Sequence, residues 1–307
     1  MIDPDHPAAS IDSANSASTD HAATLIARAA TAAPNDVLVQ WIALRQSERT
    51  TPPGELMEPA FGRLQKLEPD NASVWTHGLM RASQQHGAAA IEAAIQHMAA
   101  STRVDEHVAD IMKALIAANR RYPLPEEYFR LASANSSMAI VTPQSVPYVL
   151  AATVAIATAL PAYQTLIAAC KPTADFQPAA ARLDDCARIG RLMAANGDTL
   201  IANRIGFAVL RVTRRYCDDD VKLARAQDWL MEEYGRLASG DYVASSTQLV
   251  AQVDDRVATG SELEAMRRAV ARANLPSEPP ADWIDPRSPF SAERLRQDRQ
   301  APAPAAR

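Results

Sequence analysis

The sequence predicts an all-α protein, in which stacked antiparallel helical hairpins continue into a second helical bundle. Roughly one residue in five of the 307 is alanine, which costs no side-chain entropy in a helix, and only 10 residues are glycine. Apolar residues recur with helical spacing along most of the chain. No segment shows the β-branched alternation, bounded by Asn-Gly or Asp-Gly turns, that a sheet requires.

A sequence echo at a spacing of 34 residues organises the first half of the chain. Its matched positions are Trp41 and Trp75; Ala60 and Ala94; Phe61, Ile95 and Phe129; and Leu64 and Met98. A fixed period of this length is typical of a helix–turn–helix unit that is copied head to tail. We therefore expect one helical hairpin in each period.

Caps and breakers divide this half into helices. Residues 1–18 lack periodicity and predict a disordered leader, after which a helix begins at Thr19 or Asp20. Asn35 or Asp36 caps the next helix, and Asn71 caps another. We expect three helical pairs. The first joins a helix from about residue 36 to a helix that begins at Pro52-Pro53. The second joins 72–85 to 88–100, and the third joins 105–121 to 125–134.

The region 36–134 resembles the tetratricopeptide repeat. Trp41 and Leu44 occupy the family's first-helix Trp and Leu positions, Phe61 its second-helix aromatic position and Pro69 its terminal proline; Trp75, Ala94 and Ile95 keep the pattern in the second repeat. The family's small residue after the Leu is Arg45 and then Leu79, and its second-helix alanine is Met57, Ile91 and Pro125. These departures make the match divergent.

The resemblance implies a binding face along the first helices of the repeats. Carried over position by position, that face contains Gln46, Ser73, Thr76, Met80, Ser83, Gln84, His107 and Asp110. Hydroxyl, amide and methionine side chains suit an extended peptide or a helix better than an anionic ligand. A solvated surface is the alternative for the same residues.

The stretch from Leu131 to Cys170 contains no charged side chain. Tyr148–Ala169 has about the length of a membrane span, but Pro161 interrupts it, polar residues dilute it and no Lys/Arg cluster flanks it. We expect two buried helices, roughly 147–160 and 162–170, and no membrane partner. A membrane-associated or exported protein remains an open alternative.

The remaining helices are expected at 179–195, 199–216, from Asp218, 242–258 and 262–273. Domain bounds follow as 19–134 for the hairpins and 135–275 for the C-terminal helical half. Proline density marks 276–307 as a tail that is mostly disordered, with a short helix possible at 291–299.

The net charge and the cysteine content limit the classes of partner and the cellular compartments that fit the sequence. The net charge is -5 and no dense basic face is evident, which argues against nucleic acid. No secretory signal is evident in the sequence as written, so we expect a cytoplasmic protein, with a periplasmic or exported one as the alternative. Cys170 and Cys186 flank a helix–loop–helix: two buried thiols are expected in a reducing cytosol, and a disulfide in an oxidising compartment.

No catalytic or phosphate-binding motif occurs, and we expect no cofactor and no metal site. His97 and His107, with Glu106, lack the spacing of a ligand set. The leading hypothesis is a non-enzymatic interaction or scaffold protein that binds a peptide or helix. The alternative is an enzyme or small-ligand protein with an apolar pocket in 138–170, lined by Tyr148, Tyr163 and Gln164.

Overall fold

The computed structural model describes residues 21–48, 56–123, 125, 142, 144–159, 163–239, 246–285 and 287–290. Within these ranges the regular secondary structure is helical. Two isolated β-bridges also occur there, between Asn71 and Arg103 and between Val104 and Gly197. The all-α prediction is confirmed. The chain divides into two compact units, 1–69 and 70–307.

The first unit contains a helix over 21–32, α2 (Val37–Glu48) and α3 (Met57–Leu67), and α2 packs against α3. Asp36 caps α2, because its Oδ1 accepts from the Val39 amide at 3.1 Å. Trp41 is buried and its indole N–H donates to Glu68 at 2.7 Å. A tryptophan buried in this way anchors the hairpin without leaving its N–H unpaired.

In the second unit, α4 (Ala72–Gln84) and α5 (Ala88–Ala100) form a hairpin with the predicted bounds to within one residue. Asn71 caps α4 as predicted, accepting from the Ser73 amide at 3.2 Å. The hairpin packs on three later helices, α9 (Tyr163–Cys170), α10 (Ala180–Asn196) and α11 (Leu200–Thr213), through one apolar core. Helix α5 contacts α10 and α4 contacts α9, so the second hairpin belongs with the C-terminal helices.

Helix α6 (Val108–Arg121) packs against α8 (Val146–Ala159) and α13 (Ser246–Thr259). The expected partner of α6 within a third repeat, 125–134 with Phe129, lies outside the described residues apart from Pro125. The division at Pro69 therefore falls inside the region predicted as one module, 19–134, because α4 and α5 bury their apolar faces against α9 and α10.

The apolar middle of the chain contains two separate helices, as expected. Helix α8 buries Tyr148, Ala151 and Ala155, and α9 buries Tyr163 and Leu166. Because α8 ends at residue 159 and α9 begins at 163, the stretch 148–169 is not one continuous helix. Among the described residues, no helix has both the length and the apolar character needed to cross a membrane.

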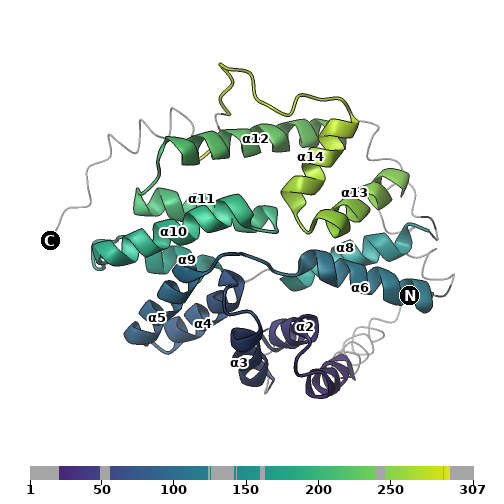
Figure 1. Cartoon of the computed structure of the whole chain (residues 1–307), viewed down its shortest axis with the longest axis horizontal. Coiled ribbons are helices and arrows are strands. Elements are labelled where there is room, and N and C mark those ends of the chain that lie inside the picture. The colour runs from purple at the N-terminus through teal and green to yellow at the C-terminus, as the bar shows by residue number, and fades with distance from the viewer. Residues whose placement is uncertain are drawn as a thin grey trace, which may run out of the picture. The chain divides into compact units, whose positions relative to one another are not determined.

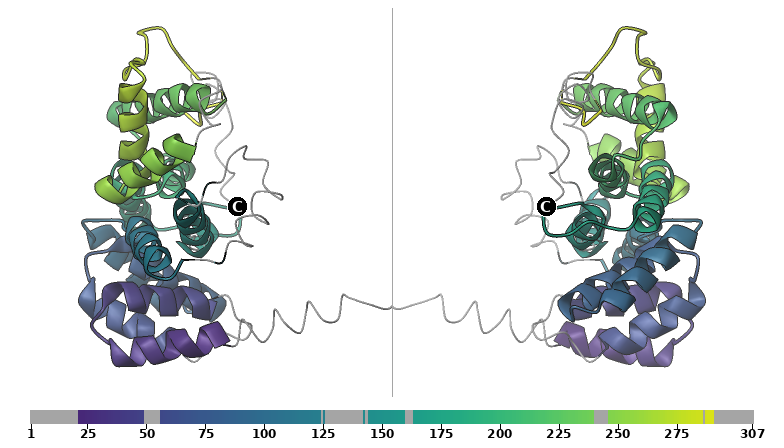
Figure 2. Two further views of the ribbon diagram at one scale, coloured as in Figure 1. Left: turned by 90° about the vertical axis from the view of Figure 1, so that its right-hand side faces the viewer. Right: turned by 90° about the vertical axis from the view of Figure 1, so that its left-hand side faces the viewer.

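Helices α12 (Asp218–Ser239) and α14 (Glu262–Arg272) pack against each other, and α14 also packs against α13. The segment after α14, yellow in Figures 1 and 2, runs over α12. Trp283 meets Trp229 edge to face at 5.2 Å, and Phe290 is buried against Phe207 and Tyr216. The expectation of a disordered tail is therefore wrong for 276–285 and 287–290, because these aromatic side chains fix it on the helices.

A buried polar junction joins three parts of the second unit: the segment before α6, the turn between α10 and α11, and the start of α14. At its centre, the Asp198 amide donates to Val104 at 3.3 Å, and the Asp198 carbonyl accepts from the Glu262 amide at 3.0 Å and from Arg256 at 3.3 Å. The Thr199 hydroxyl donates to Glu106 at 3.3 Å.

The carboxyl group of Asp198 is held in an unfavourable environment for a charge. The pKa of this group is raised to about 7, chiefly by burial and also by the neighbouring charge of Asp105, whereas the Glu106 amide, Arg256 and the Val108 amide act in the opposite direction. The junction therefore contains a carboxyl group that titrates near neutral pH.

Candidate functional site

The eight residues predicted to line a binding face differ widely in exposure. Gln46 belongs to the first unit and the other seven to the second. Ser73, Thr76 and His107 are buried. Gln46, Met80 and Ser83 are partly exposed, and Gln84 and Asp110 are exposed. The Thr76 hydroxyl donates to the carbonyl of Ala72 within its own helix. The accessible part of the predicted face is therefore smaller than the sequence pattern suggested.

His107 precedes α6 and has a left-handed backbone, with φ of 57°. Its Nδ1 lies 3.1 Å from Asp110 Oδ2, and its amide donates to Asp105 at 2.8 Å, so the imidazole helps to close the first turn of α6. His97 instead stacks on Trp75, with ring centroids 3.8 Å apart. In the described parts of the chain, no group of three or more His, Cys, Asp or Glu is placed to hold a metal ion.

The three residues expected to line an apolar pocket have different surroundings. Tyr148 on α8 accepts a hydrogen bond from Arg120, Tyr163 is part of the core between α4 and α11, and Gln164 is exposed. The expectation of one pocket lined by all three is corrected, because α8 and α9 pack against different partner helices.

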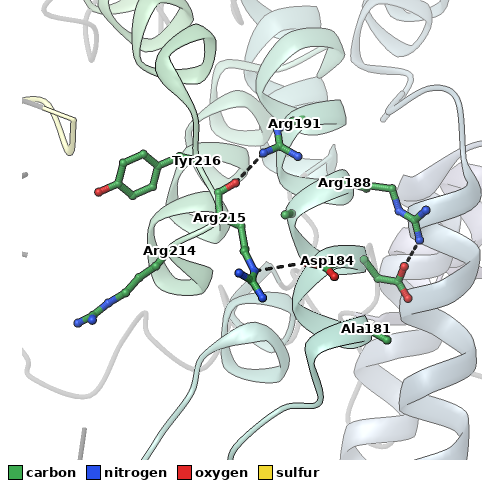
Figure 3. Close-up of a pocket in the computed structure, with 9 residues that line it drawn as sticks. Ala181, Asp184, Arg188, Arg191, Arg214, Arg215 and Tyr216 are labelled. Atoms are coloured by element: carbon green, nitrogen blue, oxygen red, sulfur yellow. Dashed lines mark hydrogen bonds and ion pairs between the residues drawn. The ribbon is translucent and has the colours of Figure 1, made fainter. Parts of the chain in front are cut away.

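An open cleft of about 740 Å³ lies between α10 and the end of α11 (Figure 3). Four arginines line it: Arg188, Arg191, Arg214 and Arg215. The carboxylates of Asp184 and Asp185 and the ring of Tyr216 complete the polar part of the lining.

Three of the four guanidinium groups have partners, as Figure 3 shows for the pairs within the cleft. Arg188 pairs with Asp185, and Arg215 lies 3.3 Å from Asp184. Arg191 donates to the Arg215 carbonyl at 2.7 Å and contacts Asp220 beyond the cleft at 3.2 Å. The remaining guanidinium, that of Arg214, makes no side-chain hydrogen bond or ion pair with the described residues.

Local structure explains why the arginines gather here. Arg188 and Arg191 are three residues apart on α10 and so share one face of that helix. Arg214 is the C-cap of α11 and has a left-handed backbone with φ of 54°, which turns the chain and brings Arg215 and Tyr216 over α10. Cations at this end also complement the negative end of the helix dipole. The cleft is therefore cationic at its α11 side.

The side chains of the cleft remain accessible to a ligand. The Arg188 side chain is 65% exposed, Arg215 46% and Arg191 45%, so a bound carboxylate could reach each without displacing the core. Guanidinium groups bind carboxylates through two parallel N–H···O bonds. Ion pairs at this exposure contribute little to folding stability, which leaves the arginines free to exchange partners.

Sequence reasoning missed this cleft. The arginines that face Asp184 and Asp185 were not among the predicted binding residues. The i, i+3 spacing of Arg188 and Arg191 and the Arg214-Arg215 pair at a helix end were the available signals. Their convergence depends on the close pairing of α10 and α11, which spacing along one helix does not reveal.

Comparisons of the chain with protein-family models, with curated proteins and with solved structures found no match. The fold class that the structure defines is therefore an all-α protein with two compact helical units.

Proposed function

We propose that this protein is a non-enzymatic interaction protein whose arginine-lined cleft binds an acidic segment of a partner protein. The observation that carries the proposal is that four arginines from α10 and the end of α11 line one open cleft, with Arg214 unpaired among the described residues. An acidic segment would bring a carboxylate to Arg214 and could compete for the exposed guanidinium groups beside it.

The sign pattern of the cleft favours a peptide over a nucleic acid. Asp184, which is 65% exposed, and Asp185 stand among the arginines and would repel a continuous line of phosphates. A peptide can place a carboxylate beside Arg214 and a neutral or basic residue beside Asp184. The net charge of -5 for the whole chain is also unfavourable for a polyanion.

The helical hairpins supply the scaffold, and we propose that α2–α3 and α4–α5 are divergent tetratricopeptide-like repeats. Matched positions on the second helices support this, because Ala60, Phe61 and Leu64 are buried, as are Ala94, Ile95 and Met98. If the match is structural, Phe61→Ala and Ile95→Ala should each cost about 3 kcal/mol of unfolding free energy. A loss from one and not the other would contradict equivalent roles.

Fluorescence anisotropy with a labelled Glu-Ser repeat peptide tests the proposed function on the full chain. We expect the double variant Arg188→Ala/Arg214→Ala to bind about tenfold more weakly than the wild type, because each guanidinium makes a charge-assisted contact. The matched control is Arg267→Ala/Arg272→Ala, which removes two exposed arginines from α14.

Two comparison probes make the outcome decisive. A Lys-Ser peptide of the same length should not bind, and a single-stranded oligonucleotide should bind more weakly than the acidic peptide. Equal loss of acidic-peptide binding in both double variants, preference for the oligonucleotide, or no binding by the wild type would each overturn the proposal.

A further inference from the structure

A second, smaller pocket of about 180 Å³ lies where five helices of the second unit meet. Its apolar wall is drawn from α6, α8, α13 and α14: Met112, Ala152, Leu249, Val253, Ala265 and Met266. Helix α12 contributes Tyr234. Because side chains from separate helices line it, the pocket is a feature of the tertiary packing and not of one groove on a helix surface.

The polar residues of the lining include one that is largely removed from solvent. Arg256 lines the pocket and is only 7% exposed. One terminal nitrogen of Arg256 lies 2.8 Å from Glu262 Oε2, and the other donates to the Asp198 carbonyl at 3.3 Å. Its Nε is buried and has no acceptor among the described residues. A guanidinium has five N–H donors, more than these two bonds use, so Arg256 can also donate to a ligand oxygen in the pocket.

The charges around Arg256 limit the kind of oxygen that would be accepted. Glu262 already neutralises the guanidinium, and Asp198 is a second carboxyl group beside it. A further carboxylate would therefore be repelled, whereas a neutral carbonyl or hydroxyl oxygen would not. Gln252, also in the lining, is a neutral polar group that suits the same chemistry.

The volume limits the size of the ligand. An apolar protein cavity of about 150 Å³ accommodates benzene, so 180 Å³ admits a molecule slightly larger than benzene. We propose that this pocket binds a small neutral molecule that has an apolar body of about six to nine carbons and a single carbonyl or hydroxyl oxygen, which accepts from the Arg256 guanidinium. This function is separate from the cleft between α10 and α11.

Three probes of similar size test the proposal on the full chain: acetophenone, ethylbenzene and benzoate. Dissociation constants from titration calorimetry or ligand-observed NMR should rank acetophenone tightest, about tenfold tighter than ethylbenzene, which lacks the acceptor. Benzoate should bind most weakly because it brings a charge next to Glu262 and Asp198.

Two variants separate the pocket from non-specific binding. Ala152→Phe fills the apolar wall and should abolish binding of all three probes, whereas Ala117→Phe, on an exposed face of α6, should leave the constants unchanged. Arg256→Lys keeps the charge and removes the guanidinium donors, so the preference for acetophenone over ethylbenzene should fall to about one.

Any of three results would overturn the proposal: Ala152→Phe binds the probes as the wild type does, benzoate binds most tightly, or the wild type binds none of the probes. The last result is expected of a pocket that is filled by ordered water. If Arg256→Lys does not fold, the Ala152→Phe and Ala117→Phe pair still decides it.

Discussion

The backbone of Gly190 occupies the space that a side chain at Gly206 would need. A Cβ built on Gly206 would stand 2.5 Å from the Gly190 carbonyl oxygen and 2.4 Å from the Ala194 amide nitrogen, and both are backbone atoms. Helices α10 and α11 therefore approach each other as closely as their backbones allow. The cleft lined by the four arginines lies along this pair, so its geometry depends on the two glycines.

We predict that Gly206→Ala destabilises the protein by about 3 kcal/mol, because the added methyl group forces the two backbones apart. Urea unfolding followed by circular dichroism would measure the change. Gly235→Ala on α12 is the matched control, since a Cβ there meets nothing within 4 Å. It should stabilise by about 0.5–1 kcal/mol through helix propensity. A loss in both variants would show that close packing is not the cause.

The carboxyl group of Asp198 should make stability fall as pH rises towards neutral. Its pKa in the folded chain is about 7, against an ordinary value of 3.8 for an aspartic acid in water. Between these values the folded chain holds a proton that the unfolded chain has released, so raising the pH favours unfolding. The contribution is fully present below pH 4 and is lost as the pH rises through 7. Its size is of the order of 4 kcal/mol.

Urea unfolding of the wild type and of Asp198→Asn at pH 5, 6, 7 and 8 would check this. The variant should lack the part of the pH dependence of the unfolding free energy that comes from this carboxyl group. It should also be more stable than the wild type at pH 8, because an amide carries no desolvated charge. Asp254→Asn, which replaces an exposed carboxylate on α13, controls for other titrating groups. Parallel pH profiles for the wild type and Asp198→Asn would contradict the prediction.

Cys170 and Cys186 form a disulfide that joins α9 to α10. The preference of the sequence analysis for two buried thiols is therefore corrected. Because the crosslink closes a loop of 16 residues, its removal by the double variant Cys170→Ala/Cys186→Ala should cost about 3 kcal/mol. Cys217→Ala should have little effect, since that cysteine is free and exposed.

Thiol counting checks the same bond directly. The denatured, unreduced chain should present one reactive thiol, that of Cys217, and three after reduction. Three reactive thiols in chain purified without reductant would show that the pair is not bonded.

Helix positions were predictable because they depend on local signals. The bounds of α4, α5 and α8 agree with the sequence analysis to within a residue, since Asn71, Gly87 and Pro147 act on their immediate neighbours. In contrast, the contact of α5 with α10 joins helices about 90 residues apart, as the Arg182–Glu92 ion pair illustrates. Apolar periodicity shows that a face is buried but not which helix covers it.

The candidate sites were less predictable for the same reason. The arginine cleft needs the glycine contact between α10 and α11, and the small pocket needs five helices to converge on Arg256. Neither arrangement has a linear motif. The predicted binding face used a linear pattern, and the burial of Ser73 and Thr76 shows that such a pattern does not fix exposure.

The two helix caps that the sequence analysis identified should differ in importance. Asp36 is exposed and accepts from one amide, that of Val39. Asn71 is fully buried; besides capping α4, it accepts from the Asp105 amide at 3.0 Å and donates to the Asp105 carbonyl at 2.8 Å. It therefore holds the segment before α6 against the start of α4. We predict a loss of about 1 kcal/mol for Asp36→Ala and about 3 kcal/mol for Asn71→Ala.

Hydrogen–deuterium exchange read by mass spectrometry separates the two effects. Asp36→Ala should speed exchange only in the first turn of α2, whereas Asn71→Ala should speed it both at Ser73 and around Asp105, which is 34 residues away. Asn71→Asp keeps the acceptor for the Ser73 and Asp105 amides and loses only the donor to the Asp105 carbonyl, so it should protect Ser73 and speed exchange around Asp105 less than Asn71→Ala does. If Asn71→Ala affected Ser73 alone, the side chain would be an ordinary cap and not a link between the two segments.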